Sequence, residues 1–145
     1  MGFFDSMDTA ASGLTAQRLR LDIISQNMAN VNTTRTAEGG PYKRKTVIFE
    51  QMQNENSFSS ILNKKKQSGV NGVRVARIVE DESQGALVYN PTHPDANAQG
   101  YVEMPNVNTV DEMVNMISAS RSYEANVTSF NTMKSMFAKA LEIGK

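Results

Sequence analysis

The sequence contains no cysteine and only one histidine, His93. Without cysteine the chain cannot form a disulfide framework, a thiolate metal site or a cysteine nucleophile. A metal site would have to be built almost entirely from carboxylates. The lack of cysteine also suits a protein that leaves the cytoplasm.

The sequence also has no excess of charge, because 15 basic residues are balanced by 15 acidic ones. Proteins that follow phosphate backbones usually carry a surplus of Lys and Arg. A run of three lysines, Lys64 to Lys66, ends the polar stretch from Gln51 to Gln67 and has no aromatic residues between its charges. This pattern predicts a solvated loop and argues against a nucleic-acid partner.

No apolar run approaches the roughly 18 to 20 residues that a helix needs to span a bilayer. The N-terminus lacks the basic start and apolar stretch of a cleaved secretory signal. Its first residues, "MGFFDS", match the myristoylation pattern at Gly2 and Ser6, but a short apolar start leading into a helix is the preferred interpretation. If the protein is exported, we expect a route without a cleaved signal.

Motifs that carry catalysis are missing as well. The chain has no phosphate-binding loop, dinucleotide fingerprint, zinc-protease helix or serine-hydrolase elbow. The one candidate is His93 with Asp95, between Pro91 and Pro94, where a general base could be sought. No nucleophile or oxyanion site accompanies them. Because prolines restrict the path and Asp bonds its own backbone, the segment is predicted to be an ordered connector.

Residues 3–31 have the period of an amphipathic helix roughly 40 Å long. Asp5 is placed to cap its start. Gly13 weakens the helix by about 1 kcal/mol relative to Ala, which indicates close packing or a bend there. The apolar stripe steps by three and four, interrupted only at Gln17, and consists of Phe3, Met7, Ala10, Leu14, Leu21, Ile24, Met28 and Val31.

Residues 109–143 are predicted to form a second long helix. Thr109 and Glu112 match a capping box, with Thr109 as the cap. The stripe, which misses at Ser120 and Lys134, consists of Met113, Met116, Tyr123, Val127, Phe130, Phe137 and Leu141. Val110, Val114 and Ile117 widen its first half, and Met133 and Met136 widen its second half.

Between the helices the pattern changes to that of β-structure. "KRKTVIFE" and "VRVARIVED" combine branched apolar residues with charged ones, and "GALVY" and "GYVEM" are shorter candidates. The predicted fold is α+β: long N- and C-terminal helices pair as a coiled coil around an inserted small β-rich domain. The expected domains are 1–32, 33–108 with a mobile loop near 51–70, and 109–145.

The two helical stripes are narrow, and a narrow stripe is typical of a helix that meets another helix. The helices can pair with each other and still leave apolar surface for neighbours. Most of the nine methionines lie in these terminal segments, and flexible thioethers suit contacts that are not strictly equivalent. The stripes are therefore the predicted assembly interface.

Three stretches carry motifs of one known family. "AASGLTAQRLRLDIISQNMANVNTT", residues 10–34, contains a helix that ends in an Asn-x-x-Asn-x-x-Thr turn, here Asn27, Asn30 and Thr33, and "YKRKTVIFE", residues 42–50, follows it. Residues 90–136 contain Pro91, His93, Pro94, Asp95, Gly100, Tyr101, Pro105 and Asn106. The first stretch is similar to the N-terminal motif of the bacterial flagellar basal-body rod proteins, the second to the stretch after that motif, and the third to their C-terminal signature. The resemblance is closest to the proximal-rod members.

The resemblance implies a structural subunit of the rod, not an enzyme, with no cofactor, no metal and no small-molecule substrate. Such chains pass unfolded through the flagellar type III export apparatus without a cleaved signal. Their terminal helices form the inner tube of the rod, which crosses the periplasm and cell wall. The implied partners are other rod proteins and copies of the chain itself, membrane-ring and rod-adaptor components, and the export apparatus, but no nucleic acid.

Two alternatives come from other functional classes. The first is a secreted coiled-coil adaptor or binding module that does not polymerise. The second is an enzyme that acts on peptidoglycan, which needs a carboxylic acid held in a cleft. The nearest acidic cluster, Glu80, Asp81 and Glu82, is predicted to be a solvated turn instead.

Overall fold

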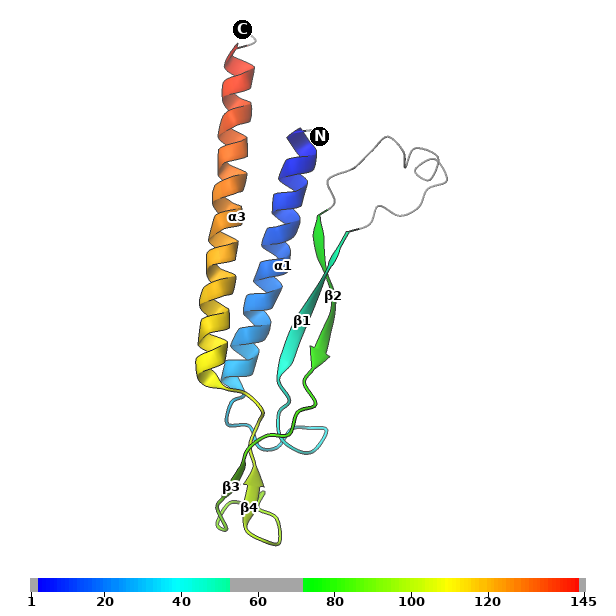
Figure 1. Cartoon of the computed structure of the whole chain (residues 1–145), viewed down its shortest axis with the longest axis vertical. Coiled ribbons are helices and arrows are strands. Elements are labelled where there is room, and N and C mark those ends of the chain that lie inside the picture. Colours follow the sequence, from blue (N-terminus) through cyan, green and yellow to red (C-terminus); the bar gives the residue numbers. More distant parts are fainter. Residues whose placement is uncertain (1–2, 53–71, 144–145) are drawn as a thin grey trace, which may run out of the picture.

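The computed structural model describes residues 3–52 and 72–143, so most of the predicted loop near 51–70 lies outside the described residues. Along the sequence two long helices precede and follow the β-strands, which confirms the predicted α+β fold (Figure 1). The elements are α1 (Phe3–Ala29), β1 (Lys45–Gln51), β2 (Val73–Glu80), β3 (Leu87–Tyr89), β4 (Tyr101–Glu103) and α3 (Thr109–Ile143).

The helices run antiparallel side by side, and α1 lies between α3 and the β1–β2 hairpin (Figure 1). The short β3–β4 hairpin lies past the helix ends, on the side opposite the two chain termini. At the other end α3 extends beyond the start of α1. The result is an elongated body in which α1 is the central element.

The boundaries of α1 differ slightly from the predicted ones. The helix already begins at Phe3, so Asp5 lies within its first turn and is not the cap. A carboxylate there still interacts favourably with the helix dipole. The helix ends at Ala29, and Val31 therefore lies in the following turn and not on the helical stripe.

The start of α3 corrects the capping-box prediction. Asn108 is the cap: its Oδ1 accepts a hydrogen bond from the Val110 amide at 3.0 Å, and its carbonyl accepts one from the Glu112 amide at 3.0 Å. Thr109 is the first helical residue. Because Asn108 caps the helix, the Glu112 side chain does not serve as part of a capping box. It is completely buried.

The β1–β2 hairpin contains a β-bulge that keeps its apolar face on α1. Ile48 pairs with Arg77 and Phe49 pairs with Val75, so Ala76 has no partner across the strand. One extra residue shifts the alternation of side chains by one position. Val73 and Val75 before the bulge and Ile78 after it therefore face the same side of the sheet, whereas Val79 faces the other side.

Gly13 lies at a close contact between α1 and α3, in agreement with the close packing that the sequence indicates. A Cβ added to Gly13 would lie 3.0 Å from the Asn126 side-chain nitrogen of α3. Ala16 and Ala119 are also buried. Small residues at these positions let the two helix backbones pack closely.

Candidate functional site

Four polar side chains meet at the junction where α1 ends, β1 begins and α3 begins. Asn27 comes from α1, Tyr42 and Arg44 from the lead-in to β1, and Glu112 from α3. Asn27 and Glu112 are buried at 1% and 0% exposure, the two largest side chains so fully enclosed in the described residues. We call this group the junction cluster.

Asn27 uses the full hydrogen-bonding capacity of its amide. Its Oδ1 accepts from the Tyr42 hydroxyl and from the Lys45 amide, both at 2.9 Å. Its Nδ2 donates to the Lys45 carbonyl and to Glu112 Oε2, again at 2.9 Å. An amide offers two acceptor sites and two donors, and all four are occupied. This explains why asparagine, rather than an apolar residue, occupies a buried helical position.

Glu112 is held as a paired carboxylate. Its Oε1 accepts from Arg44 Nε at 2.9 Å and lies 2.8 Å from Arg44 Nη2. The Glu112 side chain is 1% exposed, whereas that of Arg44 is 27% exposed. A buried charge is tolerated only when a partner and hydrogen bonds replace its water. Arg44 and Asn27 supply both.

Asn106 connects the junction cluster to the end of β2. Its Oδ1 accepts the Arg44 amide at 2.7 Å, and its Nδ2 donates to the carbonyls of Asp81 and Ser83 at 2.9 and 3.0 Å. The hydrogen bonds from Ser83 hold the pKa of Asp81 below its ordinary value. A general acid of a glycosidase needs a raised pKa instead, so Asp81 does not suit that role.

The phenol of Tyr42 is sensitive to alkaline pH. Burial raises its pKa above 10.0, and the negative charges of Glu80 and Glu112 add to the shift. Tyr42→Phe is expected to cost about 1 kcal/mol of unfolding free energy at pH 7, through the lost hydrogen bond to Asn27. A raised folded-state pKa leaves stability unchanged below pH 10 and lowers it above, where the unfolded chain ionises.

Urea denaturation at neutral pH and above pH 10 checks this expectation. The wild-type chain should lose stability above pH 10, and Tyr42→Phe should flatten that decline. Tyr89→Phe, at an exposed tyrosine, is the control and should keep the wild-type decline. An equal decline in all three proteins would contradict a role for the Tyr42 hydroxyl.

The second polar group ties the turn after α1 to the β3–β4 region. His93 Nδ1 accepts the Asp95 amide at 3.1 Å, and Asp95 Oδ2 accepts the Thr34 hydroxyl at 2.9 Å. Arg35 lies 3.7 Å from Asp95 Oδ1. Because His93 Nδ1 accepts a backbone hydrogen bond, its lone pair is occupied in the fold.

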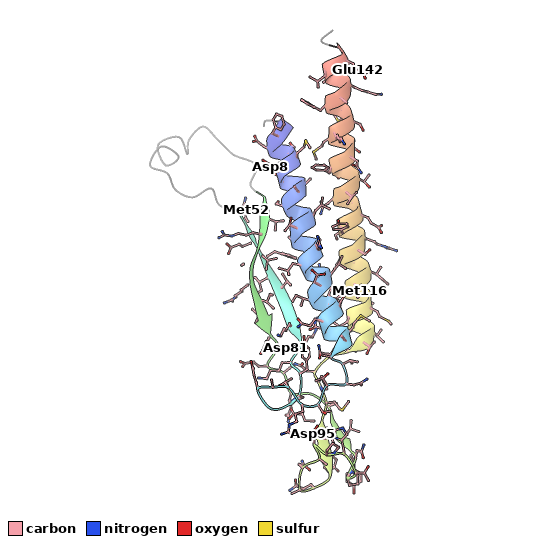
Figure 2. The ribbon with its side chains drawn as sticks, turned by 180° about the vertical axis from the view of Figure 1, so that it is seen from behind. Asp8, Met52, Asp81, Asp95, Met116 and Glu142 are labelled. Atoms are coloured by element: carbon pink, nitrogen blue, oxygen red, sulfur yellow. The ribbon has the colours of Figure 1, made fainter. Side chains whose placement is uncertain are left out.

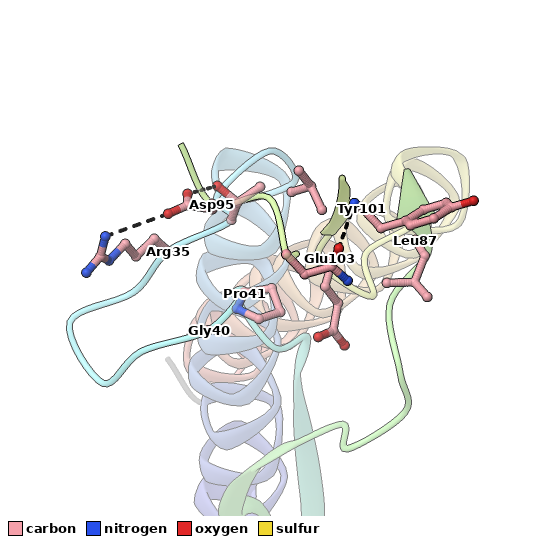
Figure 3. A pocket seen from close by; sticks show the side chains of 10 residues that line it. Arg35, Gly40, Pro41, Leu87, Asp95, Tyr101 and Glu103 are labelled. Carbon is pink, nitrogen blue, oxygen red and sulfur yellow. Dashed lines mark hydrogen bonds and ion pairs between the residues drawn. The ribbon is translucent and has the colours of Figure 1, made fainter. Parts of the chain in front are cut away.

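An open pocket of about 340 Å³ lies beside this group (Figure 3). Its lining combines Arg35 and Asp95 with residues of β3 and β4, including Leu87, Tyr101 and Glu103. Within residues 3–52 and 72–143, no three acidic or histidine side chains gather as metal ligands would. The Thr34 hydroxyl and the Asp95 carboxylate that it binds also line the pocket.

The remaining signature residues shape the β3–β4 hairpin. Gly100 has a φ of +80°, and a Cβ there would lie 2.9 Å from the Tyr89 ring. The rings of Tyr89 and Tyr101 pack edge to face at 5.2 Å. Pro105 is buried, whereas Pro91 and Pro94 are exposed. After α1, Asn30 Oδ1 accepts the Thr33 hydroxyl at 3.1 Å.

Most, but not all, residues of the two predicted apolar stripes are covered where α1 and α3 pack together. Ile24 is buried, and the other paired positions are half-buried: Met7, Leu14, Leu21, Met28, Met116, Tyr123, Val127 and Phe130. The ends of the α3 stripe are uncovered, with Met113 at 50%, Phe137 at 37% and Leu141 at 60% exposure. Sequence reasoning missed Tyr42, Arg44 and Glu112 as one group, because they are far apart along the chain.

Comparison with known proteins matches both ends of the chain. Residues 7–35 match the family model described as flagella basal body rod protein, and residues 98–143 match that of the flagellar basal body rod FlgEFG protein C-terminal. The flagellar basal-body rod protein FlgC of Bacillus subtilis is 53% identical, covering 100% of both chains. FlgC of Borreliella burgdorferi is 52% identical over 99% of this chain and 98% of its own. FlgC of Escherichia coli is 42% identical over 100% of both.

Proposed function

The chain belongs to the flagellar basal-body rod proteins of the FlgC type, and from this premise we propose that its paired terminal helices build it into the rod. It is a structural subunit and not an enzyme. The observation that carries the proposal is the uncovered apolar surface of α3. Val110 is 67% and Val114 62% exposed, although both lie on a well-formed helix.

Exposed apolar residues in such a row mark a surface that another molecule covers. In this proposal the junction cluster sets the angle between α1 and α3, and the helix pair then presents its apolar rows to neighbouring subunits. The β1–β2 hairpin covers the opposite side of α1. It therefore forms an outer layer, while the helices face the rod core.

Further details rest on family membership. The neighbours are other rod proteins and copies of this chain, with membrane-ring and rod-adaptor components around and below them. The chain reaches its place through the flagellar type III export apparatus without a cleaved signal, and the rod crosses the periplasm. In the described residues, neither long helix is apolar enough over its length to cross a membrane.

Deletion of the gene, followed by complementation, tests this function. The deletion strain is expected to grow normally but to lose motility, and the wild-type chain should restore motility and appear in isolated basal bodies. A secreted adaptor that does not polymerise would instead remain in the culture fluid. Restored motility with no chain detected in the basal bodies would contradict the structural assignment.

A further inference from the structure

A groove of about 280 Å³ lies where α1, the start of α3 and the first residues of β1 come together. Figure 2 shows Asp81, at the end of the β1–β2 hairpin, near the level of the first turns of α3, where Met116 is labelled. The groove has apolar walls, because it is lined by Ile23 and Ile24 of α1 and by Val47 and Phe49 of β1. We call it the basic groove, for the charges described next.

Three basic side chains line the basic groove. Arg20 comes from α1, Arg44 precedes β1 and Lys45 is its first residue. The one carboxylate among the lining residues, Glu112, is already balanced by Arg44 at 2.8 Å. The net charge of the groove is therefore positive, and an anion that enters it is attracted.

Arg20 differs from the other two basic residues because it has no partner. Arg44 pairs with Glu112, and Lys45 lies 3.7 Å from Glu80. Arg20 is also half-buried, yet no carboxylate of residues 3–52 and 72–143 lies within ion-pair distance of it. A half-buried guanidinium has lost part of its water, and only an anion replaces that water with strong hydrogen bonds.

We propose that the basic groove binds a partner protein, which inserts an acidic side chain with an apolar side chain beside it. The carboxylate accepts hydrogen bonds from the planar guanidinium of Arg20. The apolar neighbour covers Val47 and Phe49, which are half-buried in the lone chain. The groove is a feature of the single chain, and only the place where the partner is met rests on the proposed function.

The size of the groove favours side chains over a free ligand. Pockets that enclose a whole small molecule measure roughly 300–1,000 Å³, and this groove lies just below that range. An inorganic anion would use the cations but would leave the apolar walls uncovered. Two neighbouring side chains of a protein satisfy both parts of the groove.

A second copy of the chain is a poor occupant. The chain does offer an acidic residue with apolar neighbours, because Asp111 is exposed between Val110 and Val114 at the start of α3. The basic groove is itself lined by Glu112 and Asn115 of the same helix start. Inserting Asp111 would therefore bring two helix N-terminal ends together, and their like partial charges repel. The occupant is a different protein.

A titration with capped dipeptides tests the chemistry of the groove. The purified chain is titrated with acetylated, amidated leucyl-glutamate, and the methyl resonances of Ile23 and Val47 are followed by NMR. We expect saturable shifts. The uncharged leucyl-glutamine dipeptide should bind about fivefold more weakly, because it cannot form charge-assisted hydrogen bonds. Inorganic phosphate, which has no apolar part, should leave the two methyl resonances in place.

Substitution of Arg20 tests the residue that carries the proposal. Arg20→Met should weaken leucyl-glutamate binding to the level of leucyl-glutamine, whereas Arg20→Lys should keep most of the affinity. Arg18→Met removes an exposed arginine of the same helix that does not line the groove, and it should bind like the wild-type chain. Because Arg20 has no ion pair in the described residues, Arg20→Met should leave the urea midpoint of unfolding unchanged.

Photo-cross-linking in cells tests the occupant. A photoreactive amino acid replaces Thr46, which is exposed and lines the groove, and basal bodies are isolated after irradiation. Mass spectrometry of the cross-link should identify another flagellar protein, joined at or beside an acidic residue with an apolar neighbour. The cross-link should be lost when Arg20→Met is added and kept when Arg18→Met is added.

The outcomes separate the groove from the function. Equal binding of the two dipeptides, no saturable binding, or wild-type affinity in Arg20→Met overturns the ionic contact. Phosphate binding as tight as that of leucyl-glutamate overturns the apolar part. A cross-link from position 46 to a second copy, or none in basal bodies that contain the chain, overturns a different protein as the occupant. Absence of the wild-type chain from basal bodies overturns the proposed function and leaves the dipeptide result standing.

Discussion

Replacing Arg44 by methionine is expected to lower the free energy of unfolding by about 3–5 kcal/mol, because Glu112 would be left buried without its charge partner. The Glu112 side chain is 1% exposed, so in the wild-type fold its charge is balanced by the guanidinium and not by solvent. Asn27 would remain as a donor to Oε2, but a neutral amide does not balance a charge. Urea denaturation of the purified chain, followed by circular dichroism, measures the loss.

Arg74 provides a matched control. It also reaches a glutamate, Glu50, through both Nε and Nη2, but the two side chains are 59% and 43% exposed. Exposed ion pairs contribute about 0–1 kcal/mol, so Arg74→Met should have an effect in that range. Similar losses for the two variants would mean that Glu112 reaches water, or takes up a proton, when Arg44 is absent.

Removing both charges of the Arg44–Glu112 ion pair shows how much of the lost unfolding free energy comes from leaving one charge buried without a partner. Arg44→Met combined with Glu112→Leu is expected to recover part of the stability lost in Arg44→Met alone, because no charge remains buried. Recovery should be incomplete, since Asn27 then lacks one acceptor, at a cost of about 1–3 kcal/mol. A double variant less stable than Arg44→Met would indicate that the carboxylate is needed for more than its charge.

Ile24→Asp is expected to unfold the helix pair and the β1–β2 hairpin together. Ile24 is 5% exposed on α1, next to Val47 and Phe49 of β1 in the same cavity wall. The change loses about 1.5–3 kcal/mol of apolar burial and adds an unpaired buried charge. Together these two contributions put Ile24→Asp among the few substitutions that lower the free energy of unfolding by more than about 4–5 kcal/mol. A small domain has a total unfolding free energy of only about 5–15 kcal/mol.

Hydrogen exchange on the purified chain shows which elements fail. Because α1 lies between α3 and the hairpin (Figure 1), protection should disappear from all three in Ile24→Asp. Ile24→Val, which removes one methyl group, should cost only about 0.5–1.5 kcal/mol and keep the wild-type pattern. If β1 and β2 stay protected in Ile24→Asp, the hairpin is a separate folding unit that only rests on α1.

The contrast between Ile24 and Val114 also separates folding from assembly. Both residues are apolar and lie on long helices, and both stripes look alike in the sequence. Ile24 is enclosed within one chain, whereas Val114 is uncovered. An aspartate at position 24 therefore reports on the fold, and the same residue at position 114 reports on contacts between chains.

Much of the fold could be predicted because the signals are local. The period of apolar residues indicated a helix at 109–143, where α3 is Thr109–Ile143, and one at 3–31, where α1 is Phe3–Ala29. All four β-like segments contain a strand. The family resemblance was confirmed at both ends of the chain. Helical period and strand propensity depend on neighbours a few residues away, so they can be read along the chain.

The role of Glu112 could be decided only by the tertiary structure. Three residues after Thr109, it fits a capping box as well as a buried position, because both follow from the same local spacing. The choice depends on Asn108, which takes over the cap, and on Asn27 and Arg44, which are 85 and 68 residues away. The same holds for the exposed residues Val110 and Val114 of α3. Apolar spacing in the sequence shows that a side of a helix avoids water, but which side meets α1 and which is left for a neighbour depends on how the two helices pack.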